Sequence, residues 1–177
     1  MQDNTYPFPK SASMCFCIGA QKAGTTWLYK NLVKSDETHF CKNKELHYFT
    51  ADAGVDYYSF KNRMKMTRTL TEKLVLSDGR INRIPLEQLQ NLVELLSIYV
   101  QKPGNHGPYY KYLLSDYVDQ KVVFDITPAY ALLKAEQFAD MAQTGEAKFI
   151  FIMRDPVDRM WSQIRMAVSA ANKGKEI

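Results

Sequence analysis

The stretch CFCIGAQKAGTTWLYKNL, residues 15–32, constrains the fold more than any other part of the chain. An apolar run ends at Gly19, a turn containing Gly24 follows, and a helical pattern begins at Thr25. A buried strand that passes through a glycine-rich turn into a helix exposes backbone N–H groups and the positive end of the helix dipole. Because Lys22 adds a positive charge within the turn, this junction predicts a site for a phosphate group.

The rest of the chain repeats the order of strand and helix. Residues 40–50 are interpreted as a loop or a short strand, and residues 78–83 as a turn. Repeated alternation of buried strands and helices is typical of an α/β domain with a parallel sheet. We therefore predict an N-terminal arm over residues 1–13 and a single domain over residues 14–177. Buried strands are expected at residues 14–18, 121–125 and 148–153, and helices at residues 25–33, 56–66, 85–102, 109–118, 128–143 and 155–171.

Composition limits the classes of function. The formal charge of +4 suits a protein that handles anions, but it is too small to indicate a nucleic-acid partner. Three cysteines do not form a disulfide framework, and no residues have the spacing of a metal site. We expect one of Cys15 and Cys17 in the core and the other on the opposite face of the strand. No apolar stretch is long enough for a membrane span and no signal sequence is visible, so a cytoplasmic location is the default.

The first turn leaves two kinds of phosphate ligand open. Gly19 and Gly24 have the spacing of the nucleotide-binding loop G-x-x-x-x-G-K-[ST], and Thr26 matches its hydroxyl position. Thr25, however, stands where that loop has its lysine. Asp125, at the end of the second predicted strand, could hold magnesium in a kinase or hydrolase that uses ATP or GTP. This is one hypothesis for the function.

GAQKAGTTWL, residues 19–28, resembles the 5′-phosphosulfate loop of sulfotransferases that use 3′-phosphoadenosine 5′-phosphosulfate (PAPS). The resemblance implies that Lys22 contacts the bridging oxygen of the donor and stabilises charge on the departing phosphate oxygen. It also implies that the 5′-phosphate lies on the turn and the start of the helix. The cofactor-binding residues expected here are Gly19, Gln21, Lys22, Ala23, Gly24, Thr25, Thr26 and Trp27.

A second stretch, FIFIMRDPVDRMWSQIRM at residues 149–166, resembles the 3′-phosphate site of the same family. That site has an arginine at a strand end and a serine in the following helix, which are Arg154 and Ser162 here. Arginine can bind a phosphate group through two nitrogens. Arg159 lies nearby, and a role at the surface is equally open for it.

Two further stretches extend the resemblance to the heparan sulfate and bacterial branches of the family. KNKELHYF, residues 42–49, resembles their K-E-x-H-F-F segment, in which the glutamate takes the proton of the acceptor. Glu45 is the matching residue. His47 titrates near neutrality and remains an alternative base.

VVFDITPAYALL, residues 122–133, resembles the E-x-[ST]-P-x-Y segment of the same branches. Thr127, Pro128 and Tyr130 match, but Asp125 replaces the usual glutamate. Ile126 stands where the heparan enzymes often have lysine, which argues against heparan itself as the substrate.

Nearly the whole chain takes part in the resemblance, over residues 14–170. It implies a P-loop-like three-layer α/β sandwich, PAPS as the donor with 3′-phosphoadenosine 5′-phosphate (PAP) as the product, and no required metal. The acceptor is expected to be a small molecule or carbohydrate with a hydroxyl or amine group, and carbohydrate is favoured. Family members usually extend further, so the resemblance also implies a C-terminal truncation that removes adenine and 3′-phosphate contacts. A non-catalytic nucleotide-binding protein is therefore a third hypothesis.

Overall fold

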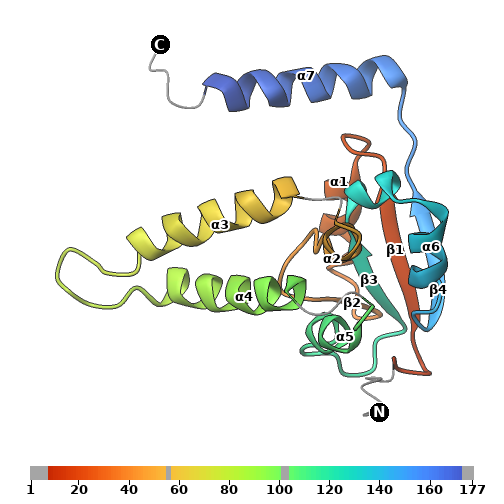
Figure 1. Ribbon diagram of the computed structural model, residues 1–177, viewed down its shortest axis with the longest axis horizontal. Helices are drawn as coiled ribbons and strands as arrows, with labels where there is room; N and C mark the ends of the chain where they lie inside the picture. Colours follow the sequence, from red (N-terminus) through yellow and green to blue (C-terminus); the bar gives the residue numbers. More distant parts are fainter. Residues whose placement is uncertain (1–7, 55–56, 101–103, 173–177) are drawn as a thin grey trace.

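A computed structural model describes residues 8–54, 57–100 and 104–172, and its centre is a parallel sheet (Figure 1). The four strands have the order β2-β3-β1-β4. They are β1 (Ser13–Gly19), β2 (Thr38–Phe40), β3 (Val122–Ile126) and β4 (Glu146–Phe151). In the register, Cys15 of β1 pairs with Phe124 of β3 and with Lys148 of β4. The strand that leads into the glycine-rich turn is therefore paired on both sides.

The remaining elements are helices of very different length. The longest are α3 (Tyr57–Glu72), α4 (Arg83–Tyr99) and α7 (Pro156–Asn172). The shorter ones are α1 (Thr25–Leu32), α2 (Tyr48–Asp52), α5 (Gly107–Leu113), the 3-10 helix η1 (Pro128–Leu132) and α6 (Ala135–Met141).

Each face of the sheet is covered by its own helices. On one face, Cys15, Cys17, Phe124 and Ile126 are buried against side chains of α1. On the other face, Phe16 and its neighbours join a larger core that α2, α4, α5, η1 and α6 complete. The order of helix, sheet and helix confirms the three-layer α/β fold that the sequence predicts.

Several details differ from the sequence predictions; for example, α3 continues to Glu72 rather than ending at Met66. Cys15 and Cys17 are both buried on the α1 side, because residues two apart in a strand share a face. Residues 48–52 form a helix within the expected loop, and α5 ends at Leu113, because Leu114 leaves the helical conformation with φ −92° and ψ 10°.

A further difference is the helix expected over residues 128–143, which is interrupted. Leu133 is extended, with ψ at 155°, and α6 begins anew at Ala135. The side chain of Gln137 accepts a hydrogen bond from the backbone N–H of Lys134 at 3.0 Å, which caps the new helix. Most of the predicted N-terminal arm, residues 1–7, lies outside the described residues. So does Asp56, the first residue of the helix predicted over residues 56–66.

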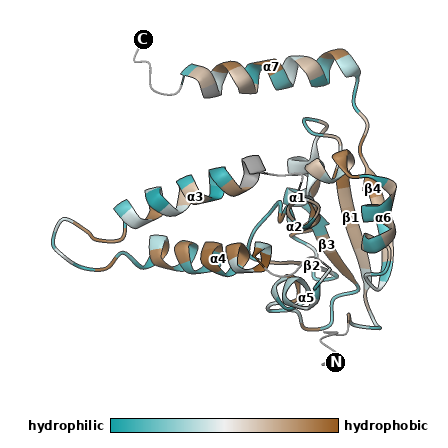
Figure 2. Cartoon of the chain, in the orientation of Figure 1, coloured by the Kyte–Doolittle hydropathy of each residue, from teal (hydrophilic) through white to brown (hydrophobic). Residues whose placement is uncertain are grey.

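Two parts of the chain extend beyond the sheet and its covering helices. α3 and α4 pack against each other and form an arm at one side of the molecule (Figure 1). α7 lies apart, at the end of the molecule to which the strands point, and its apolar and polar residues are mixed along its length (Figure 2). Across the three described ranges, no helix has both the length and the apolar character needed to cross a membrane.

Candidate functional site

Four chain segments meet at the carboxyl edge of the sheet. Because the strands are parallel, the segments that follow β1, β2, β3 and β4 all leave from this edge. The chain leaves β1 through α1 on one face and reaches α6 after β3 on the other face. Ligands of open α/β sheets bind in the crevice where neighbouring connections diverge in this way. The fold therefore places a ligand site beside the segment after β1.

The segment after β1 is built to receive an anion. Lys22 and Gly24 have left-handed φ values of 65° and 111°, which turn the chain sharply into α1. Gly24 is the N-cap of α1 and provides no side-chain cap, so the first N–H groups of the helix remain available to a ligand. A side chain at Gly24 would meet nothing within 4 Å, which shows open space in front of the turn.

Side chains link this turn to the segments after β2 and β4. Arg154 donates from Nη1 to the carbonyl oxygen of Lys22 at 3.3 Å. Lys44 donates from Nζ to Thr26 Oγ1 at 3.3 Å and to Glu45 Oε1 at 2.7 Å. The structure thus brings together Lys22, Thr26, Glu45 and Arg154, all of which the sequence predicts as site residues.

Arg154 is held between β4 and α7. Asp155 caps α7, since its Oδ1 accepts hydrogen bonds from the N–H groups of Val157 and Asp158 at 3.0 Å each. Arg154 also forms an ion pair with Asp158, at 3.6 Å between Nη2 and Oδ2. Its side chain remains exposed and has donors free for an anion, because a guanidinium group carries five N–H bonds.

α7 passes close to the turn, but the contact predicted between Ser162 of α7 and the site is not made. The ammonium of Lys22 is directed to α7, where Nζ lies 3.7 Å from the sulfur of Met166. Ser162 is half-buried on α7 and, within the part of the chain described, has no hydrogen bond to Arg154 or to the turn. Arg159 is exposed and lines the cleft described below.

The remaining cofactor-binding predictions differ in exposure. The ring of Trp27 is 70% exposed beside the turn. Gln21 is also exposed, Ala23 is half-buried, and Thr25 and Gly19 are buried. A Cβ at Gly19 would lie 2.9 Å from the ring of Phe151, so the end of β1 has no room for a larger residue.

The pKa of the Glu45 carboxyl is set mainly by His47 and Lys44, which belong to the same segment. The imidazole of His47 and the ammonium of Lys44 lower the pKa of the Glu45 carboxyl to about 2. Lys44 is the nearer, at 2.7 Å from Oε1, while His47 Nε2 lies 3.8 Å from Oε2. Glu45 is therefore ionised at neutral pH, and its carboxylate can accept a proton.

The backbone of the segment that carries Glu45 is held by long-range contacts. Arg63 of α3 donates to the carbonyl of Glu45, and Tyr99 of α4 donates to the carbonyl of Leu46. The guanidinium of Arg63 also lies over the ring of Tyr99, 5.9 Å from its centre. Sequence reasoning missed both residues, since nothing near them marks a site. It also missed Lys44, although its place beside Glu45 was a usable signal.

Beneath this segment lies a buried carboxyl group. Asp125 is 2% exposed and accepts hydrogen bonds from Thr127 and Tyr130 at 2.7 Å each and from Tyr109 at 3.0 Å. Burial raises the pKa of Asp125, and the three hydroxyl donors act against that rise. Thr127 in turn accepts a hydrogen bond from the N–H of His47 at 3.4 Å. Because the carboxyl oxygens are engaged within the core, Asp125 is poorly placed to hold magnesium at the turn.

A cleft of about 460 Å³ opens next to the turn. Its volume lies within the range of ligand pockets, roughly 300–1,000 Å³. Its lining includes Arg154 and Arg159, the first two cations after β4, and much of η1. The lining residues are Ala20, Gln21, Pro128, Ala129, Ala131, Leu132, Phe151, Met153, Arg154 and Arg159.

Comparison with known proteins gives one match. A family model described as "Sulfotransferase family" matches residues 15–176, which is nearly the whole chain. Neither the curated proteins nor the solved structures include a match. The match spans all four segments that converge at the carboxyl edge of the sheet.

Proposed function

We propose that this chain, which belongs to the sulfotransferase family, transfers a sulfuryl group from PAPS to a hydroxyl or amine acceptor. Carbohydrate is the favoured acceptor class, from the resemblance of residues 42–49 and 122–133 to the heparan sulfate and bacterial branches. The observation that carries the proposal is the convergence of Lys22, Thr26, Glu45 and Arg154 at one edge of the sheet, joined through Lys44 and through the carbonyl of Lys22.

The residues present fit the two phosphate groups of the donor. The open space at Gly24 and the uncapped start of α1 suit the 5′-phosphate, with the Thr26 hydroxyl as a further donor. Arg154 presents its guanidinium at the same edge, which suits the 3′-phosphate, and Ser162 would add its hydroxyl from α7. The exposed ring of Trp27 offers a flat apolar surface beside the turn.

In the proposed reaction, PAPS supplies an activated sulfuryl group. Glu45 takes the proton of the acceptor as the acceptor oxygen or nitrogen forms its bond to sulfur. Lys22 neutralises the negative charge on the phosphate oxygen that keeps the electron pair of the broken bond to sulfur. Its present contact with the sulfur of Met166 is weak, so its ammonium can turn to the phosphate at little cost.

Glu45 is the favoured base, and the contacts of Lys44 explain how its low pKa is compatible with that role. The Lys44 ammonium shares its hydrogen bonds between Glu45 and Thr26 of the turn. When negative charge develops at the turn, Lys44 can shift toward it and leave the carboxylate more basic. His47 is the alternative base, and it lies next to Glu45 on the same segment.

Two other hypotheses receive less support. A kinase or hydrolase would need the Asp125 carboxylate near magnesium, whereas Asp125 is engaged by three hydroxyl groups in the core. A non-catalytic nucleotide-binding protein would keep the turn but would not need an ionised Glu45 held by Lys44. Both hypotheses make distinct predictions for ligand binding.

Calorimetric titration with PAP in the absence of magnesium, beside ATP with magnesium, tests the proposal. We expect PAP to bind and ATP to bind more weakly. Lys22→Ala and Arg154→Ala should each weaken PAP binding at least tenfold, since a hydrogen bond to a charged group contributes about 1.5–3 kcal/mol. Lys65→Ala and Arg68→Ala are the matched controls, because both residues are exposed on α3, away from the turn and from Arg154.

The outcome separates the hypotheses. Preference for ATP with magnesium would refute the PAPS proposal in favour of a kinase or hydrolase. PAP binding without sulfuryl transfer to hydroxyl- and amine-bearing sugars would support the non-catalytic hypothesis. If transfer occurs, loss of the reaction in Glu45→Gln but not in His47→Gln identifies the base.

A further inference from the structure

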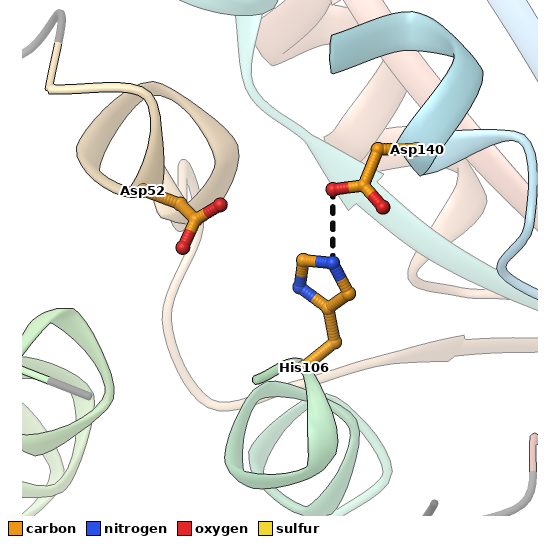
Figure 3. A group of neighbouring side chains, drawn as sticks. All are labelled: Asp52, His106 and Asp140. Carbon is orange, nitrogen blue, oxygen red and sulfur yellow. Dashed lines mark ion pairs between the residues drawn. The ribbon is translucent and has the colours of Figure 1, made fainter. Parts of the chain in front are cut away.

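A group of potential metal ligands lies on the face of the sheet opposite α1 and outside the site described above. Asp52 comes from the end of α2, His106 directly precedes α5, and Asp140 comes from α6 (Figure 3). One ligand atom from each residue lies within 4.8 Å of the others. The three residues are far apart in sequence, which is why their spacing predicts no metal site.

The charges of this group are unbalanced without a cation. His106 Nε2 lies 2.9 Å from Asp140 Oδ2, and the carboxylate of Asp52 faces the same imidazole ring (Figure 3). Two carboxylates thus share one imidazole, so the group carries net negative charge even when His106 is protonated. Within residues 8–54, 57–100 and 104–172, no lysine or arginine forms an ion pair with either carboxylate. All three side chains are half-buried, where unbalanced charge is costly.

Each ligand is also held from behind. Asp52 Oδ1 accepts a hydrogen bond from the N–H of Gly104 at 3.2 Å, which leaves its other oxygen for a cation. His106 Nδ1 lies 2.8 Å from the hydroxyl of Tyr48, and that hydroxyl lies 3.3 Å from the carbonyl of Asn105. A histidine that binds a metal typically donates its other ring N–H to a fixed partner in this way.

The proton positions support the same arrangement. With a cation on Nε2, the Nδ1–H group donates to the Tyr48 hydroxyl, which donates to the carbonyl of Asn105. Every donor in this series of hydrogen bonds then has an acceptor, and Nε2 has its lone pair for the metal.

We propose that Asp52, His106 and Asp140 bind one divalent first-row cation, such as Zn²⁺ or Mn²⁺, that joins α2, the start of α5 and α6. One imidazole nitrogen with two carboxylate oxygens is a donor set that these ions accept, and water completes the coordination. Zinc bonds of about 2.1 Å place neighbouring ligands about 3.4 Å apart, which small side-chain movements achieve here. The cation fixes α2, which directly follows the segment that carries Glu45, and it takes no part in the sulfuryl transfer.

Titration of untagged, chelator-treated protein with ZnCl₂ and MnCl₂ tests this site. We expect one ion to bind per chain and the midpoint of thermal unfolding to rise with metal concentration. Asp52→Asn and Asp140→Asn should each weaken binding at least tenfold, whereas Asp78→Asn, in an exposed turn, should leave it unchanged. These asparagine variants keep the size of half-exposed side chains, and circular dichroism confirms their folding.

A spectroscopic arm identifies the imidazole. Co²⁺ in place of Zn²⁺ gives visible absorption bands that depend on its ligands, and these bands should change in His106→Gln. The proposal is overturned if the wild-type chain binds no ion saturably, or if binding is unaffected in Asp52→Asn and Asp140→Asn. The three residues would then form only an ion-paired contact between helices. Neither result bears on PAP binding, which is measured separately.

Discussion

Replacing Tyr130 with phenylalanine tests whether the buried carboxyl of Asp125 anchors the segment with the proposed base. The Tyr130 hydroxyl donates to Asp125 Oδ2 at 2.7 Å, and the hydroxyl of Tyr109 donates to the same oxygen at 3.0 Å. Tyr130 and Tyr109 are 0% exposed and Asp125 is 2% exposed, so no water can take the place of the lost hydroxyl. Tyr130→Phe removes one oxygen atom and leaves the ring in place.

The expected loss follows from that single hydrogen bond. A bond to a charged group contributes about 1.5–3 kcal/mol, so we expect the free energy of unfolding to fall by about 2 kcal/mol at neutral pH. Burial raises the pKa of Asp125 above 3.8, and losing a donor to the charged form raises it further. Above that pKa, the buried carboxylate therefore destabilises the folded state more in the variant than in the wild type. The loss should therefore be full at neutral pH and smaller where the carboxyl is protonated.

Urea denaturation of the wild type and the variant across this pH range measures the effect. Tyr29→Phe is the matched control, because the Tyr29 hydroxyl forms no hydrogen bond within the described ranges and its ring packs in the smaller core. A loss of less than about 0.5 kcal/mol, below the usual contribution of even a neutral hydrogen bond, would refute the reasoning. A loss that stays the same at acid pH would show that Asp125 is not the partner that matters.

Two further substitutions test other parts of the site. The pKa of Glu45 falls from 4.5 to about 2 on folding, so its charge contributes stability above pH 4.5 that is lost as the pH falls toward 2. Glu45→Gln should reduce the fall in thermal stability over this acid range, and identical pH profiles for variant and wild type would contradict the pairing with His47 and Lys44. Gly19→Ala places a Cβ 2.9 Å from the ring of Phe151 at a φ of 155°. We expect it to cost about 1–3 kcal/mol in urea denaturation, and an unchanged midpoint would show that β1 adjusts freely.

The sequence predicts those parts of the fold that depend on local pattern. The alternation of apolar runs and helical patterns is enough to predict the parallel sheet, and the turn after Gly19 is enough to predict an anion site. Local cues that oppose a pattern are harder to weigh. The apolar and helical residues at 128–143 suggest one helix, but the extended backbone of Leu133 and the cap at Lys134 divide it.

Contacts between distant residues could not be predicted from one sequence. Arg63 and Tyr99 reach the proposed base segment only because α3 and α4 fold back beside it. Likewise, Asp52, His106 and Asp140 become neighbours only once α2, α5 and α6 pack on the same face of the sheet. Arg154 and Lys22 were predicted from separate segments, and the fold supplies their direct hydrogen bond.

The contacts of Arg63 and Tyr99 have a consequence for how this protein can change in evolution. Side chains from three separate elements hold successive backbone groups: the carbonyls of Glu45 and Leu46 and the N–H of His47. Among the described residues of the arm formed by α3 and α4, two positions, Arg63 and Tyr99, make these contacts. The exposed positions of the arm can therefore accept substitutions, and the arm can acquire new surfaces, without displacing the proposed base. Selection for the reaction would then act on Arg63 and Tyr99, whereas selection for a binding partner of the arm would act on the exposed residues of the same helices.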